Sequence, residues 1–106
     1  MAVLTVYART ADPVFVAAGG SGDTFVNNGD TELIIVNAGI ADVDVTIAAT
    51  NPCRQGFTDD WVVTCEGQEL TRIGPFDATR FNSSLGVATV TYDDETNLTI
   101  AAQRLR

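Results

Sequence analysis

Turn-forming residues divide this chain at short intervals, and the segments between them favour β-strands. The turn signals are Asp12-Pro13, Gly19-Gly20-Ser21-Gly22, Asn27-Asn28-Gly29-Asp30, Asn37-Ala38-Gly39, Glu66-Gly67-Gln68 and Gly74-Pro75. Asn and Gly mark turns because they tolerate positive φ, and Pro marks them because it cannot donate to a strand ladder. No segment of a dozen residues carries a sustained apolar stripe with the 3.6-residue helical period. The sequence therefore predicts seven to nine short strands and little helix.

The apolar pattern inside these segments predicts how each strand is buried. Val3 to Ala8 alternates and predicts a first strand, and residues 31–37 have a solid apolar centre that predicts burial on both faces. Apolar and polar residues alternate along residues 41–50, which predicts a strand with one solvent-exposed face. The further predicted strands are residues 14–16, 61–65, 69–73, 87–92 and 98–102. At 106 residues the chain predicts one all-β domain, residues 1–106, built as an antiparallel β-sandwich or jelly roll.

The stretch LTRIGPFDATRFN, residues 70–82, predicts a stiff corner between two strands. Pro75 stops strand pairing because it has no N–H, and Gly74 permits a sharp bend before it. Phe76 and Phe81 then supply apolar anchors that would pin this crossover over the end of the core.

The charge of the chain excludes several classes of partner. The formal net charge is −8, from 14 acidic and six basic residues, and all six basic residues are Arg because the chain has no Lys and no His. Such a charge repels phosphate, so we expect no nucleic-acid partner, and it offers no basic face to an anionic membrane. A Lys-free acidic surface suits a high-salt, halophilic host. A GC-rich genome, which favours Arg codons, explains the same composition.

No apolar run approaches the length of a membrane span, and the first seven residues lack the basic region of a secretory signal. We therefore expect a soluble protein that is made in the cytoplasm without a signal peptide.

The two cysteines, Cys53 and Cys65, flank a polar loop and a strand. A disulfide between them would close a loop of about a dozen residues and stabilise the fold by roughly 2–3 kcal/mol. Two free thiols in a reducing cytoplasm are the alternative. Two cysteines without His make a zinc site improbable.

The remaining reactive residues do not form a catalytic pattern. Acidic clusters occur at Asp42/Asp44, Asp59/Asp60 and Asp93-Asp94-Glu95, without calcium-loop spacing, and are typical of a solvated face. Ser83-Ser84 has no His to activate it, and no phosphate-binding loop follows a strand. Asn82 and Asn97 fit the short N-glycosylation pattern, which has meaning only in a secreted or surface protein. We therefore predict no enzyme activity, no metal and no cofactor.

One family resemblance covers roughly residues 22–105. The succession GDTFVNNGDTELIIVNAG, DVTIAAT, LTRIGPF and VATVTYDDETNLTIAAQRL is similar to small head (capsid) decoration or minor head proteins of tailed phages and related viruses. Its most specific parts are Gly22-Asp23-Thr24 with Asn28-Gly29, the Gly74-Pro75-Phe76 corner and the closing strand pair. The segment from Pro52 to Cys65 and the acidity depart from that pattern.

The resemblance implies a β-domain on the outside of an icosahedral shell, at the surface of a virion assembled in the host cytoplasm. It implies the major capsid protein as partner, and several copies clustered at symmetry axes, for example as trimers. Residues that would suit such an interface are Arg9, Arg72, Arg80, Arg104 and Arg106, with Trp61, Phe76 and Phe81 as anchors. The N-terminal strand could instead augment the sheet edge of a neighbour.

Other functions compete with capsid decoration. The chain could be another virion component, such as a turret, head-fibre base or tail protein, in which case its copy number per particle would be low. It could also be a carbohydrate- or ligand-binding β-sandwich, which would require a concave aromatic patch.

Overall fold

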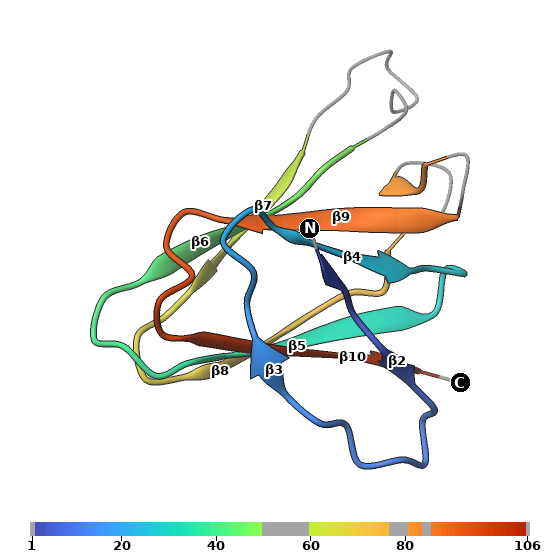
Figure 1. The fold of residues 1–106 in the computed structure, drawn as a ribbon, viewed down its shortest axis with the longest axis horizontal. Coiled ribbons are helices and arrows are strands. Elements are labelled where there is room, and N and C mark those ends of the chain that lie inside the picture. The colour runs from blue at the N-terminus through green and yellow to red at the C-terminus, as the bar shows by residue number, and fades with distance from the viewer. Residues whose placement is uncertain (1, 50–59, 77–80, 84–85, 106) are drawn as a thin grey trace.

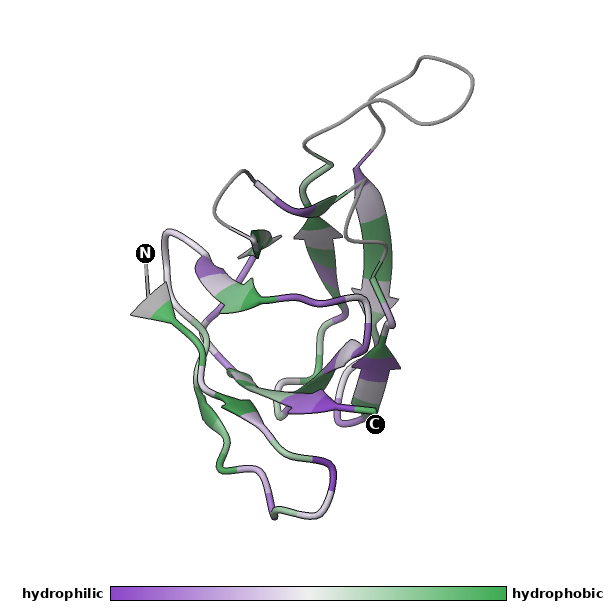
Figure 2. Ribbon diagram, turned by 90° about the vertical axis from the view of Figure 1, so that its right-hand side faces the viewer, coloured by the Kyte–Doolittle hydropathy of each residue, from purple (hydrophilic) through white to green (hydrophobic). Residues whose placement is uncertain are grey.

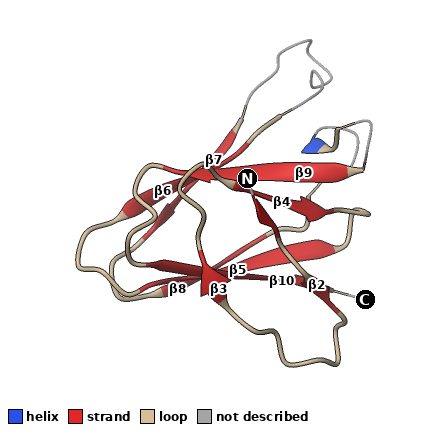
Figure 3. Ribbon diagram, in the orientation of Figure 1, coloured by secondary structure: helices blue, strands red, loops and turns tan. Residues whose placement is uncertain are grey.

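The computed structural model describes residues 2–49, 60–76, 81–83 and 86–105. Within these ranges, all regular secondary structure is β-strand apart from one helical residue, Phe81 (Figure 3). The ten strands are β1 (Ala2–Val3), β2 (Val6–Tyr7), β3 (Val16–Ala17), β4 (Asp23–Val26), β5 (Thr31–Asn37), β6 (Val43–Ile47), β7 (Trp61–Cys65), β8 (Leu70–Ile73), β9 (Val87–Tyr92) and β10 (Leu98–Arg104).

The strands form two sheets packed face to face, which confirms the predicted β-sandwich (Figure 1). Sheet A has the order β1-β4-β9-β6-β7, and sheet B has the order β2-β10-β5-β8. The short strand β3 also belongs to sheet B, where it pairs with β10 beside β2. Hydrophobic segments occur along the strands of both sheets, and the buried core lies between them (Figure 2).

The strands pair in a nested order. The innermost antiparallel pair is β6 with β7, and around it lie β5 with β8, β4 with β9 and β3 with β10. Two more antiparallel pairings, β6 with β9 and β5 with β10, join these ribbons into sheets. A folded ribbon of this kind is the topology of a jelly roll, one of the two architectures expected from the sequence.

The N-terminal segment differs from the expected single strand. It is split into β1, which pairs in parallel with β4 of sheet A, and β2, which pairs in parallel with β10 of sheet B. Leu4, between the two strands, is buried in the core, and its backbone N–H donates to the Thr24 carbonyl at 2.7 Å. Alternating apolar residues predict extended backbone but do not show which sheet receives it, so the crossing between sheets was not predicted.

The other predicted strands are all present, and some of them differ in length from the prediction. The strands β7 and β9 have the predicted bounds, and β10 extends two residues beyond the predicted end at Ala102. The centre of β5 is buried on both faces as predicted, since Leu33, Ile34 and Ile35 are at most 3% exposed. The strand β4 was not predicted, because its four residues are followed directly by the Asn-Gly turn signal.

Four aromatic rings form one end of the core. Phe76 lies at their centre, with ring centroids 5.2 Å from Phe25, 5.6 Å from Trp61 and 6.0 Å from Phe81. Phe76 and Phe81 are buried, whereas Trp61 is partly exposed. Tilted and edge-on ring pairs add stabilisation beyond the apolar area that they bury. The predicted anchoring of the residue 74–82 crossover by Phe76 and Phe81 is therefore confirmed.

The bend at Gly74 explains why this corner has the sequence Gly-Pro. Gly74 has φ of 130°, and a Cβ at this position would lie 2.9 Å from the Thr31 carbonyl oxygen. A side chain is therefore excluded by both backbone conformation and space. The peptide bond that follows, Gly74–Pro75, is cis.

A buried asparagine holds the same corner to the β4–β5 turn. The Asn27 side-chain amide donates to the Phe76 carbonyl at 3.2 Å and to the Asn82 side-chain oxygen at 2.8 Å. Its own oxygen accepts from the Gly29 N–H at 3.0 Å, and Asn82 donates back to the Asn27 carbonyl at 2.5 Å. The crossover between β8 and β9 is thus tied to the start of β5 by polar contacts at residues 27 and 82.

A buried asparagine also makes side-chain hydrogen bonds to the backbone at the opposite end of β5. The Asn37 oxygen accepts from the Gly39 N–H at 3.0 Å, and its amide donates to the Ala41 and Cys65 carbonyls at 2.9 and 3.2 Å. An Asn-x-Gly triplet therefore closes an Asx turn at each end of the central strand. Both Asn side chains are 1% exposed, so their bonds belong to the core rather than to the surface.

Candidate interaction surface

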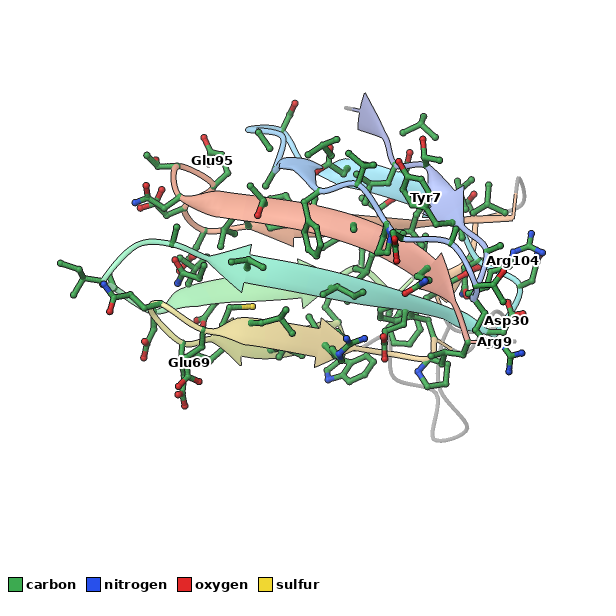
Figure 4. All side chains as sticks on the ribbon, turned by 90° about the horizontal axis from the view of Figure 1, so that it is seen from below. Tyr7, Arg9, Asp30, Glu69, Glu95 and Arg104 are labelled. Atoms are coloured by element: carbon green, nitrogen blue, oxygen red, sulfur yellow. The ribbon has the colours of Figure 1, made fainter. Side chains whose placement is uncertain are left out.

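Two of the predicted interface arginines are exposed at the same end of the molecule. Arg9 and Arg104 lie together with Asp30 at one end of the long axis (Figure 4). Arg72, on β8, forms an ion pair with Glu32 at 2.8 Å, in which the Arg72 side chain is exposed and the Glu32 side chain is mostly buried. The guanidinium of Arg72 is thereby already paired within the chain. Arg80 and Arg106 lie outside the described residues.

Two of the three predicted aromatic anchors are buried in the core. Phe76 and Phe81 are 1% and 3% exposed, so neither ring offers a face to a partner. Trp61 is half-buried and packs against both rings, which leaves only part of its surface accessible. We therefore assign Phe76 and Phe81 to fold stability and do not retain them as docking residues.

Cys65 is a free thiol at the end of β7, fully buried in the core between the sheets. The disulfide expected between Cys53 and Cys65 is therefore not formed in this structure, and Cys53 itself lies outside the described residues. The Cys65 side chain points inward because it shares the core face of β7 with Trp61 and Val63. Burial raises the pKa of this thiol, so it stays protonated and unreactive at neutral pH.

Carboxylates gather at the end of the molecule opposite Arg9 and Arg104. We call this the acidic end. Glu69 and Glu95 mark it in Figure 4. It comprises seven side chains from the β5–β6, β7–β8 and β9–β10 turns and the strand ends beside them: Asp42, Asp44, Glu66, Glu69, Asp93, Asp94 and Glu95. None of the three described arginines belongs to these turns. Carboxylates are thus concentrated at one end of the long axis, while the opposite end carries Arg9 and Arg104 together with Asp30.

Several acidic-end carboxylates cap backbone groups at the turns. Asp42 accepts from the Gly67 N–H at 3.0 Å, Asp93 from the Asp44 N–H at 3.0 Å, and Asp94 from the Thr96 N–H at 3.1 Å. A hydrogen bond with the Thr96 side chain, together with this last bond from the Thr96 backbone, lowers the pKa of Asp94. In the described part of the chain, no group of three or more His, Cys, Asp or Glu side chains could hold a metal ion.

The acidic end also retains uncompensated repulsion. The negative charge of Glu69 and a hydrogen bond to it raise the pKa of Glu66, and the charge of Asp42 adds to this effect. A raised carboxyl pKa means that the folded state disfavours the charged form of Glu66. The turns therefore tolerate electrostatic strain, which salt would relieve.

The outer face of sheet A has a different character. We call it the Thr/Val face. The residues that share it alternate with core residues along the five strands: Val3, Thr24, Val26, Thr46, Val62, Thr64, Val87, Thr89 and Thr91. Cross-strand pairing places these side chains beside one another, as in Thr24 with Thr89 and Thr46 with Thr91. The one charged strand residue on this face is Asp44, opposite Thr64 at the acidic end. This surface could not be predicted from the sequence, because it is formed only through the strand register.

The outer face of sheet B is partly covered by the chain itself. The connection between β2 and β3 passes over it (Figure 1). Gln103 of β10 holds that connection by donating to the carbonyls of Ala8, Arg9 and Ala11 at 3.2, 3.2 and 2.8 Å. This face also carries the Glu32–Arg72 ion pair, so it is neither bare nor uncharged.

A small apolar pocket lies between the N-terminal segment and β10. Its volume is about 70 Å³, and its walls include Leu4, Tyr7, Val14, Val16 and Ile100. Ligand sites for drug-sized molecules occupy roughly 300–1,000 Å³. This pocket therefore does not favour the ligand-binding alternative.

One of the two candidate glycosylation positions is engaged in the fold. The Asn82 side-chain nitrogen, which glycosylation would modify, donates to the Asn27 carbonyl. The other, Asn97, is exposed.

The fold and its surfaces define a jelly-roll β-sandwich with one acidic end and one sheet face formed mainly by Thr and Val. Comparison of the chain with protein-family models, with curated proteins and with solved structures finds no match in any of the three. No helix in the described ranges is long and apolar enough to cross a membrane.

Proposed function

We propose that the protein is a virion structural protein that decorates the outside of an icosahedral capsid. In this role it binds the major capsid protein and stabilises the shell. The family resemblance supports the proposal, and the positions that carry the resemblance are ones that shape the fold. Asp23, for example, is buried and accepts from the Gly19 N–H at 3.0 Å and the Tyr92 hydroxyl at 2.7 Å.

The observation that carries the proposal is the concentration of carboxylates at one end of the long axis and the exposure of Arg9 and Arg104 at the other. A protein that sits upright on a surface needs two unlike ends, because one contacts the surface and the other faces the solution. Arg9 and Arg104 are exposed at one end, where they can form charge-assisted hydrogen bonds with carboxylates of the shell. The acidic end would face outward, where its repulsion keeps particles apart and concentrated salt screens it.

The test is co-sedimentation of the purified protein with capsids of its parent virus that lack it, at the salt concentration of the host. We expect saturable binding at hundreds of copies per shell. The double variant Arg9→Ala/Arg104→Ala should bind at least tenfold more weakly. Arg72→Ala is the matched control, because the Arg72 guanidinium already pairs with the Glu32 carboxylate and is not free to bind the shell.

The outcomes separate the alternatives. Saturation at a few copies per particle would indicate a turret, head-fibre base or tail protein instead. No binding by a chain shown to be folded would refute the proposal. Equal loss of binding in the double variant and in Arg72→Ala would refute the proposed orientation while leaving the decoration role intact.

A further inference from the structure

We propose that the turn between β3 and β4 binds a calcium ion, with the Asp23 carboxylate and the Gly22 carbonyl as ligands and the charge of Glu95 beside them. The proposal concerns the protein by itself and does not rest on capsid binding. It follows from one buried oxygen atom, from the space in front of that atom and from the charges around it.

The Asp23 carboxylate is buried, and only one of its two oxygens is hydrogen-bonded. Asp23 is 1% exposed. Its Oδ2 accepts from the Gly19 N–H at 3.0 Å and from the Tyr92 hydroxyl at 2.7 Å. Its Oδ1 is buried as well, and no hydrogen-bond donor among the described residues reaches it. Because a buried polar atom without a partner is costly, this oxygen calls for a ligand.

A glycine keeps the space in front of this oxygen open. A Cβ at Gly19 would lie 2.8 Å from Asp23 Oδ1 and 2.9 Å from the Gly22 carbonyl oxygen. Both oxygens therefore approach one spot, which any side chain at position 19 would fill. Calcium takes oxygen ligands from carboxylates and from backbone carbonyls, at about 2.3–2.6 Å. The pair of oxygens is thus of the type that binds this ion.

A second carboxylate lies against the same turn. Glu95, in the β9–β10 turn, places its Oε1 3.3 Å from where a Cβ of Gly20 would be. Glu95 is partly buried and belongs to the acidic end (Figure 4). Since Gly19 and Gly20 are adjacent, the carboxylates of Asp23 and Glu95 approach the turn at neighbouring residues. Like charges placed in this way favour binding of a cation.

No arginine in the described ranges neutralises Asp23. Arg72 is already paired on β8, and Arg9 and Arg104 lie at the opposite end of the molecule from the acidic end (Figure 4). Tyr92 leaves the charge in place, because burial, the hydrogen bond to Asp23 and the charge of Asp23 all raise the pKa of its hydroxyl, which stays protonated. A buried carboxylate charge is stable when it is paired or coordinates a metal ion.

The ligands indicate calcium rather than another metal. Zinc prefers nitrogen and sulfur ligands, and magnesium requires a near-ideal octahedron, whereas calcium accepts irregular sets of oxygens. The site has two carboxylates, fewer than the three side chains of the metal clusters sought above, so carbonyl and water oxygens must complete it. Such a site is weak. We expect a dissociation constant on the order of 1 mM, as in extracellular calcium-binding modules.

A calcium titration of the EDTA-treated, ¹⁵N-labelled protein tests the proposal. Amide resonances report both the affinity and the place of binding, and NaCl at about 0.15 M screens diffuse attraction to the acidic surface. We expect saturable shifts that fit one dissociation constant and are centred on residues 19–24, with a smaller response at Glu95. The ion itself is the probe, so the capsid plays no part.

Three variants locate the ligands. Asp23→Asn keeps the size of the side chain but removes its charge, and should weaken calcium binding at least tenfold. Glu95→Gln should weaken it about threefold, because Glu95 contributes charge beside the ion. Glu69→Gln is the matched control, since it removes the same charge from the acidic end but lies in the β7–β8 turn, and it should leave the dissociation constant unchanged.

Each outcome decides the matter. Localised, saturable shifts that Asp23→Asn abolishes and Glu69→Gln spares support the proposal. Absence of saturation up to about 20 mM calcium overturns it, because water alone then satisfies Asp23 Oδ1. Shifts spread over all the acidic-end turns, or equal weakening by Asp23→Asn and Glu69→Gln, also overturn it. If Asp23→Asn does not fold by circular dichroism, the comparison of Glu95→Gln with Glu69→Gln decides by the same criterion.

Discussion

Replacing Asn27 with Ala tests whether the crossover between β8 and β9 depends on a single buried amide. The substitution removes three side-chain hydrogen bonds, to the Phe76 carbonyl, the Asn82 side-chain oxygen and the Gly29 N–H. A lost hydrogen bond costs about 1 kcal/mol, and a partner left unsatisfied in the interior costs about 1–3 kcal/mol. The Asn82 and Gly29 groups are part-buried and can recover water, so the Phe76 carbonyl bears the larger penalty. We expect a loss of about 3 kcal/mol in the free energy of unfolding.

Urea denaturation followed by tryptophan fluorescence of Trp61 measures this loss. With a slope of about 1.5 kcal/mol per molar urea for a domain of this size, the midpoint should fall by about 2 M. Asn28→Ala is the matched control, because Asn28 is its exposed neighbour and should change stability by less than about 0.5 kcal/mol. A double-mutant cycle with Asn82→Ala should give a coupling energy of about 1 kcal/mol or more. A loss below about 1 kcal/mol in Asn27→Ala would refute the reasoning.

Three further predictions concern other sites. Gly67→Ala should lower the free energy of unfolding by at least about 2 kcal/mol, because the new Cβ would overlap the Ile40 carbonyl oxygen. Gly86→Ala should lower it by about 1 kcal/mol, because the space around Gly86 is open and only its positive φ is unfavourable for Ala. Equal losses for the two variants in chemical denaturation would contradict this reasoning. In a Cys53→Ser variant, which keeps Cys65 as its one thiol, Cys65 should react with Ellman's reagent only at the rate of unfolding, and a rapid native reaction would show that it is accessible. Because the pKa of Glu66 is raised in the folded state, its contribution to stability is greatest below its unfolded pKa and is lost as the pH rises through the folded value. Glu66→Gln should therefore stabilise the protein at neutral pH and low salt, and this gain should vanish in about 1 M NaCl; a gain that persists there would exclude charge repulsion as its cause.

The sequence predicted those parts of the fold that depend on local pattern. Strands such as β7 and β9 could be predicted because alternating or continuous apolar residues end at recognisable turns. The Gly74-Pro75 corner was predictable because each residue restricts the backbone independently of its surroundings. The burial of Phe76 and Phe81 followed from their place beside that corner.

The parts that were missed depend on contacts between distant residues. The parallel pairings of β1 and β2 could not be predicted, since an alternating segment does not reveal which sheet edge receives it. Asn27 was expected only as a turn residue, and its bonds to Phe76 and Asn82 join segments about 50 residues apart in the chain. The Thr/Val face was hidden for the same reason, because Thr24, Thr46 and Thr89 become neighbours only through strand register. Cys65 was misjudged because its spacing from Cys53 says nothing about which way its side chain points.

The nested strand order has a consequence for the speed and order of folding. The paired residues Ile47 and Trp61 are 14 positions apart, Leu33 and Ile73 are 40, Asp23 and Val90 are 67, and Val16 and Ile100 are 84. Closing a long loop costs entropy that only later contacts recover, so each outer pair forms most readily once the pair inside it is in place. The chain is therefore expected to close from the β6–β7 hairpin outward, on a timescale of milliseconds to seconds. Its two ends, which lie side by side in the native protein as β2 and β10, are the last parts to meet.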